Sequence, residues 1–188
     1  MTLGATLSET EKRQQHASDP AVSAWVSASA GTGKTKVLTD RVLRLLLEGG
    51  PPQRVLCLTF TRAAASEMVN RLNQRLVAWV TATDARLTQD LNILTGDDVN
   101  TTQLTQARCL LARVLDAPGG MRIQTIHSFC ESLLGRFPLE ANVPPHFSVM
   151  DDRGAVDLLE AARDTLLNSI QNNDGSDLGN ALRVIALN

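Results

Sequence analysis

The residues with the clearest chemistry lie between positions 28 and 35. They are Ala28, Ser29, Ala30, Gly31, Thr32, Gly33, Lys34 and Thr35. They match the phosphate-binding pattern G-x-x-x-x-G-K-[ST], with alanine where the first glycine is usual. The two glycines let backbone N–H groups approach phosphate oxygens closely. The Lys34 ammonium group supplies a charge for the β- and γ-phosphates, and the Thr35 hydroxyl is a Mg²⁺ ligand in such loops. The motif predicts a site for ATP and Mg²⁺.

The elements around this loop should position it. Residues 21–27 ("AVSAWVS") form a short apolar run, which predicts a buried strand. Residues 34–48 show apolar side chains at helical spacing, and the following Gly-Gly-Pro-Pro ends that helix. An ordinary glycine-rich turn before a helix is the alternative, but the agreement of strand, loop, Lys-Thr pair and helix favours phosphate binding. Trp25 and Trp79 are expected in the core.

The rest of the chain continues an α/β pattern. Further strands are expected at residues 54–61 and 121–126, and a long helix at residues 62–80. A strand–helix–strand order of this kind predicts a parallel sheet flanked by helices. Residues 81–103 read as a mostly polar excursion. Helices are also expected at residues 103–115, 127–137 and 152–172, the last with an apolar stripe that should be buried, followed by a further helix before residue 188.

Composition excludes several classes of protein. The 188 residues carry 18 basic and 20 acidic side chains, so any basic groove must be local. Cys57, Cys109 and Cys130 fit neither a zinc pattern nor a disulfide framework, and we expect reduced core cysteines in a cytoplasmic protein. No apolar run has membrane length, and the first residues lack the apolar region of a secretory signal.

A second segment narrows the kind of nucleotide enzyme. In "LTFTRAAASEM", Thr59, Phe60 and Thr61 lie at the carboxyl end of a predicted strand, where ligands bind in open α/β sheets. Hydroxyls and helix N–H groups suit sugar-phosphate contacts, and an aromatic ring suits base stacking. The alternative is that Phe60 belongs to the core and the threonines serve the strand and a helix cap.

Several motifs together carry a family resemblance. The phosphate loop, "LTFTRAAASEM", "IQTIHSF" (123–129) and "VPPHFSVMDD" follow one another in the order of the UvrD/RecB family of superfamily-one DNA helicases, which they resemble. The resemblance covers most of residues 10–155. The stretch from Ser23 to Gly49, "HSFCESLLGRFPLEANV" and the long excursion between Val80 and Met121 look most like the AddA branch of helicase–nucleases, of the alphaproteobacterial type.

The resemblance implies residue roles. Gln14 would read the adenine edge, Arg71 would lie near the nucleotide, and Lys34 and Thr35 would keep the roles given above. Lys36 stands where relatives often have arginine, which weakens the case for a contact there. Contacts with single-stranded DNA would come from Thr59, Phe60, Thr61, Arg62, Thr125 and His127. Solvent exposure of Gln14 and Arg71, a structural hydrogen bond of His127, and a helix-capping role for Ser128 are the alternatives.

The resemblance also implies a fold and an activity. The fold would be an incomplete P-loop NTPase of the RecA-like type, with an N-terminal helix (1–20), a partial ATP-binding domain (21–150) and the start of a helical insertion subdomain (151–188). The parent protein would bind single-stranded and duplex DNA, unwind it in break repair, and pair with an AddB-like partner. No Asp-Glu dipeptide occurs among the 188 residues, so we expect an N-terminal piece that hydrolyses little or no ATP alone.

Three other functions remain open. Another UvrD-family helicase would share every motif named above. A P-loop kinase for a small molecule would leave "TFTRAAASEM" without an evident use. A non-catalytic nucleotide- or DNA-binding module would need a chain that folds and functions at this length.

Overall fold

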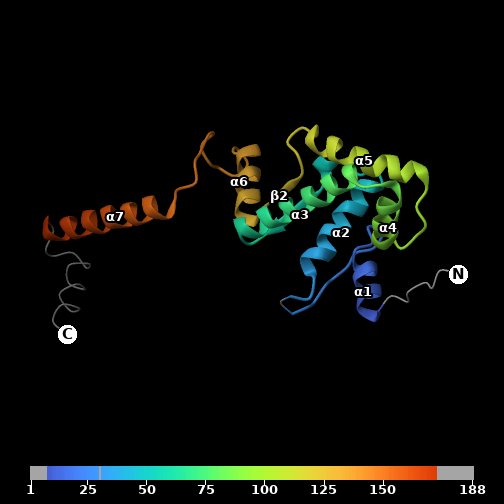
Figure 1. Ribbon diagram of the computed structural model, residues 1–188. Coiled ribbons are helices and arrows are strands. Elements are labelled where there is room, and N and C mark those ends of the chain that lie inside the picture. Colours follow the sequence, from blue (N-terminus) through green and yellow to red (C-terminus); the bar gives the residue numbers. More distant parts are fainter. Residues whose placement is uncertain (1–7, 30, 173–188) are drawn as a thin grey trace. The chain divides into compact units, whose positions relative to one another are not determined.

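The computed structural model describes residues 8–29 and 31–172 (Figure 1). The chain divides into two compact units, the first ending at Cys130 and the second beginning at Glu131. The helix expected near the C-terminus lies outside the described residues. In the first unit the elements are α1 (Glu9–Ala17), α2 (Lys34–Leu47), η1 (Pro52–Arg54), β1 (Leu56–Thr59), α3 (Arg62–Thr81), α4 (Asp84–Thr95), α5 (Thr101–Leu115) and β2 (Arg122–Thr125).

The sheet is small and parallel. β1 pairs with β2 in a register that sets Leu56 beside Arg122 and Thr59 beside Thr125. α3, α4 and α5 lie between the two strands along the chain, as parallel pairing requires a crossover connection. The predicted parallel α/β arrangement at residues 54–61, 62–80 and 121–126 is therefore confirmed, with slightly shorter strands.

The core of the first unit forms where the crossover helices meet α2. α3 contacts α2, α5 and both strands. Its side chains Leu72, Leu76 and Trp79 are fully buried, and Leu43 of α2 and Leu110 of α5 are buried with them. The core position predicted for Trp79 is thus confirmed. The helix that begins at the phosphate loop, α2, packs its apolar face against this core.

The strand predicted at residues 21–27 is wrong. This segment has no strand structure, and Trp25 is 95% exposed. A strand needs hydrogen-bonded neighbours to satisfy its backbone groups, and the described strands pair only β1 with β2. The apolar composition of residues 21–27 predicted a buried strand, but none of the described strands pairs with this segment. The core position expected for Trp25 is wrong for the same reason.

The polar excursion expected at residues 81–103 contains a helix, α4. Leu87, Leu91 and Leu94 lie along one face of it and are buried. The Thr83 hydroxyl caps its first turn by accepting a hydrogen bond from the Arg86 backbone N–H, and Gly96 ends it at a φ of 86°. Three leucines at this spacing outweigh the Thr, Asp, Asn and Gln residues between them, which is why composition alone failed here.

The second unit contains α7 (Asp152–Asn172), as predicted, and α6 (Ile126–Arg136) extends from the first unit into it. The stripe expected to be buried on α7 is exposed; it includes Val156, Leu158, Leu159, Leu166 and Leu167. The segment between Phe137 and Asp151 forms neither helix nor strand, so it adds no regular second layer against that stripe. None of the described helices combines the length and apolar character needed to cross a membrane.

The cysteines differ from the expectation of a buried set. Cys109 in α5 and Cys130 in α6 are exposed, whereas Cys57 in β1 is half-buried. Burial raises the pKa of the Cys57 thiol above its ordinary value. The reactive species is the thiolate, so its fraction at Cys57 is reduced at any pH below that raised pKa.

Alkylation rates should reflect this difference. With iodoacetamide at mildly alkaline pH, Cys57 should react more slowly than either exposed cysteine, because it is less accessible and less ionised. Peptide mapping of the modified chain over time measures the three rates separately. A Cys57 that reacts first would contradict the partial burial of its side chain.

Candidate nucleotide and DNA site

The phosphate loop has the backbone geometry that its glycines allow. Gly31 and Gly33 have φ angles of 81° and 89°, which lie in a left-handed region that residues with a Cβ atom rarely adopt. Gly33 is the N-cap of α2, and no side chain caps that helix end among the described residues. The N–H groups of the first turn therefore face the loop without a capping oxygen, which suits an anion. Ala30 lies outside the described residues.

The Lys34 side chain lies across this loop. Its Nζ donates hydrogen bonds to the carbonyl oxygens of Ala28 (2.6 Å) and Ser29 (2.7 Å). The Thr32 hydroxyl donates to the Ser29 carbonyl at 2.7 Å. Lys34, Ser29 and Thr32 are exposed, and Thr35 is half-buried in the first turn of α2. The ammonium group is thus at the loop and accessible to an anion from solvent.

α1 brings Gln14 to the same loop. The Gln14 Nε2 donates to the Thr32 carbonyl at 3.3 Å, and a Cβ added to Gly33 would lie 3.1 Å from that nitrogen. A capping box begins α1: the side chains of Ser8 and Glu11 each accept a hydrogen bond from the other residue's backbone N–H. The hydrogen bond that the Glu11 carboxylate accepts from the Ser8 backbone N–H, together with its interaction with the Ser8 hydroxyl, holds the Glu11 pKa below its usual range. Of the two adjacent glutamines, it is Gln14 that contacts the phosphate loop.

A polar pocket of about 320 Å³ lies between α2 and α3. Its lining residues are Lys36, Thr39, Asp40, Arg71, Gln74 and Arg75. Asp40, whose side chain is 10% exposed, pairs with the Lys36 Nζ at 2.8 Å and with the Arg75 Nη1 at 3.7 Å. Arg71 is half-exposed and pairs with Glu67. The structure thus places Arg71 and Lys36 on one pocket, and Lys36 follows Lys34 in the first turn of α2.

The predicted DNA-contacting segments meet at one edge of the sheet. The register pairs Thr59 with Thr125, so both strands end side by side. Phe60 follows β1 and is 88% exposed, which rules out the core position considered for it. The Thr59 hydroxyl donates to the Thr61 carbonyl (3.0 Å), and the Thr61 hydroxyl caps α3 by accepting from the Ala64 N–H (3.1 Å). The Thr61 hydroxyl is therefore partly engaged in capping α3. The neighbouring Phe60 ring projects into solvent.

The second segment divides into buried and exposed residues. Thr125 is only 5% exposed, and its hydroxyl bonds the Ser128 hydroxyl (2.9 Å) and accepts from the Ser128 N–H (3.1 Å). It therefore orients the start of α6, and this geometry does not favour the direct DNA contact expected of its side chain. His127 and Arg62 are exposed and are the better placed candidates for contacts with phosphate.

Several polar residues that sequence reasoning missed lie on α2 and α3. Asp40 and Arg75 form an ion pair in the polar pocket between these helices, and Arg41 and Arg44 of α2 contact the end of α1 and the segment that follows it. In the sequence these four residues read as ordinary charged positions on amphipathic helices. Only the spacing of Arg41 and Arg44, one helical turn apart, hinted that they share a face.

Comparison with known proteins defines the class. Residues 8–184 match the model of the UvrD/REP helicase N-terminal domain, so the chain belongs to this family. The ATP-dependent helicase/nuclease AddA of Lactobacillus johnsonii is 34% identical over 151 residues, which are 80% of this chain and 11% of that protein. The protein of the same name from Lactobacillus delbrueckii subsp. bulgaricus is 36% identical over 152 residues, 79% of this chain and 11% of that protein. The chain therefore spans about a tenth of the length of the curated relatives it matches.

Proposed function

We propose that this chain supplies the ATP-binding loop and the first single-stranded DNA contacts of an ATP-dependent DNA helicase that acts in double-strand-break repair. Its similarity to proteins named as ATP-dependent helicase/nucleases supports an AddA-like parent with an AddB-like partner in the cytoplasm. The observation that carries the proposal is the pairing of Thr59 with Thr125, which brings both predicted DNA segments to one edge. The RecA-like form of the complete domain and its further insertion are part of the same proposal.

The residues present fit a nucleotide. The left-handed glycines, the uncapped start of α2 and the Lys34 ammonium group form a positive cradle of the right kind for phosphates. Lys34 would hold the β- and γ-phosphates, Thr35 would hold Mg²⁺, Gln14 would contact adenine, and Arg71 would lie beside the nucleotide. Bound ATP would supply, by its hydrolysis, the free energy for translocation along DNA.

The DNA edge offers both kinds of contact that single strands need. Phe60 presents an exposed ring for stacking on a base, with Thr59 and Thr61 on either side of it. The start of α3 adds the positive end of a helix dipole, and Arg62 and His127 add exposed donors for phosphate. Such a combination binds single strands without requiring a particular base sequence.

Direct binding tests the proposal. The purified chain should bind MgATP by isothermal titration calorimetry and a labelled oligothymidine by fluorescence anisotropy. We expect little or no ATP turnover from it alone. Failure to bind either ligand would contradict the proposal, and strong DNA-stimulated turnover that depends on Lys34 would contradict the expected dependence on further parts of the protein.

Phe60→Ala should weaken oligothymidine binding about 5- to 150-fold, since stacking on an aromatic side chain contributes roughly 1–3 kcal/mol per base. Binding of MgATP should stay unchanged because the Phe60 ring projects into solvent and makes none of the described contacts of the phosphate loop. The matched control is Ile93→Ala, which removes an apolar side chain that is 64% exposed on α4. Equal losses for both variants would point to nonspecific apolar binding.

A further inference from the structure

The position of α1 is not explained by apolar packing. None of the residues from Glu9 to Ala17 is buried, yet this helix brings Gln14 to the Thr32 carbonyl of the phosphate loop. A helix without a buried face needs polar contacts to fix its place on a domain. Those contacts come mainly from α2, the helix that begins in the phosphate loop itself.

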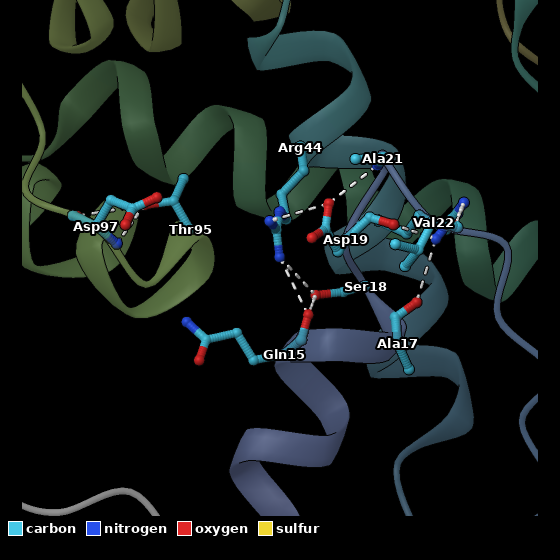
Figure 2. Close-up of polar contacts among 10 residues, drawn as sticks. Gln15, Ala17, Ser18, Asp19, Ala21, Val22, Arg44, Thr95 and Asp97 are labelled. Atoms are coloured by element: carbon cyan, nitrogen blue, oxygen red, sulfur yellow. Dashed lines mark hydrogen bonds and ion pairs between the residues drawn. The ribbon is translucent and has the colours of Figure 1, made fainter.

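Arg44 contacts both backbone and side-chain oxygens at the end of α1 and just after it (Figure 2). Its Nη1 donates to the Gln15 carbonyl at 3.1 Å and to the Ser18 hydroxyl at 3.3 Å, and its Nη2 lies 3.6 Å from an Asp19 carboxylate oxygen. The Arg44 side chain is 11% exposed and Ser18 is 2% exposed. The rigid guanidinium fork therefore fixes the last turn of α1 from a largely buried position.

Arg41, one turn earlier on α2, continues the same contact. Its guanidinium donates to the carbonyl oxygens of Ala17 (3.3 Å), Asp19 and Val22 (2.7 Å). A cation at the carboxyl end of a helix also complements the helix dipole. α2 thus carries the phosphate loop at its start and holds α1 with two arginines further along.

Gln15 gives α1 a second support on another side. Its side chain extends toward the end of α4, where Thr95 and Asp97 lie (Figure 2). A Cβ added to Gly96 would come 2.0 Å from the Gln15 Nε2, so the amide group lies directly against this glycine. The adjacent glutamines therefore diverge, with Gln14 on the phosphate loop and Gln15 on the end of α4.

We infer that Arg44, assisted by Arg41, is a positioning residue that fixes α1 so that Gln14 reaches the nucleotide base. The inference rests on the proposed function and on the adenine-reading role of Gln14. The polar contacts of the Arg44 side chain go to the end of α1 and the residues just after it, so its effect passes through α1. Loss of Arg44 should therefore impair recognition of adenine and spare recognition of the phosphates.

Binding of three ligands separates these effects. ATP, GTP and inorganic tripolyphosphate, each with Mg²⁺, are titrated against the unmodified chain and against Arg44→Ala, Arg44→Lys and Arg13→Ala. Arg44→Ala should reduce the preference for ATP over GTP and tripolyphosphate about tenfold, which corresponds to about 1.4 kcal/mol. Tripolyphosphate binding should stay within about twofold, a factor equal to RT ln 2 or roughly 0.4 kcal/mol.

The other two variants serve as rescue and control. Arg44→Lys should recover part of the preference, because lysine keeps the charge but lacks the planar fork. Arg13→Ala should have no effect, because the Arg13 side chain is 79% exposed on α1 and pairs with Glu9 of the same helix. Hydrogen exchange adds a readout that needs no nucleotide: amides at the end of α1 should exchange faster in Arg44→Ala than in Arg13→Ala.

The outcomes separate this inference from the proposed function. A chain that binds ATP no better than tripolyphosphate before any substitution overturns the role of Gln14, and the inference falls with it. A chain that prefers ATP and keeps that preference in Arg44→Ala overturns the inference alone. Loss of tripolyphosphate binding together with ATP binding in Arg44→Ala would indicate general unfolding and would also overturn it.

Discussion

Replacing Lys34 by alanine is expected to weaken MgATP binding about 10- to 150-fold, since a hydrogen bond to a charged group contributes about 1.5–3 kcal/mol. The Lys34 ammonium group lies at the mouth of the loop, on the carbonyls of Ala28 and Ser29. Phosphate oxygens would compete with these two carbonyl acceptors for the ammonium group, so the measured loss is the net value of that exchange. Isothermal titration calorimetry with MgATP measures it.

The Lys34→Ala variant should remain folded. Its side chain is exposed and takes no part in the core, so the midpoint of urea unfolding should change little. Lys12→Ala, which removes an exposed lysine from α1, is the matched control and should bind MgATP normally. Equal affinity of the Lys34→Ala variant and the unmodified chain would remove the phosphate loop from the proposed site.

The largest effect on stability is expected at Trp79. Trp79→Ala should lower the free energy of unfolding by about 3–5 kcal/mol, the range found when a buried aromatic side chain is removed. Trp79 is completely buried, and the Arg75 guanidinium lies 5.8 Å from its ring centroid. A domain is usually stable by only about 5–15 kcal/mol, so a large share of the variant should be unfolded in mild urea.

Trp25 provides a control of the same residue type. Because Trp25 is 95% exposed, Trp25→Ala should change the free energy of unfolding by no more than about 0.5 kcal/mol. Circular dichroism in the far ultraviolet during urea unfolding measures both variants without depending on tryptophan fluorescence. Similar losses for the two variants would show that residues 21–27 are packed after all.

The elements that could be predicted from the sequence are those set by local signals. The apolar spacing of α2 depends on residues within a few turns of each other, and this helix appears as predicted. The capping box of Ser8 and Glu11 at the start of α1 is a signal of the same local kind. The pairing of Thr59 with Thr125 was also foreseeable in outline, because the carboxyl ends of parallel strands share one edge. The phosphate-loop glycines belong to this group, since their left-handed angles follow from the motif.

The elements that could not be predicted depend on distant partners. Residues 21–27 have the composition of a buried strand, but burial of a strand is decided by neighbours that the segment itself does not encode. The roles of Arg41 and Arg44 depend on backbone carbonyls of α1 and of the segment that follows it. A backbone carbonyl is present in every residue, so a contact to it cannot be recognised from residue types. The arginine contacts that position α1 therefore could not be predicted from the sequence.

The parallel sheet has a consequence for how the molecule reaches its folded state. β1 and β2 can pair only after residues 60–121 have closed into a loop, and long loops add entropic cost before strand contacts compensate for it. Within that interval α5 contacts both α3 and α4, so the assembly of these helices shortens the effective loop. We therefore expect the alignment of Thr59 with Thr125 to form late in folding. Substitutions in the crossover helices should affect the edge proposed to bind DNA through the rate at which it forms, even where they touch none of its residues.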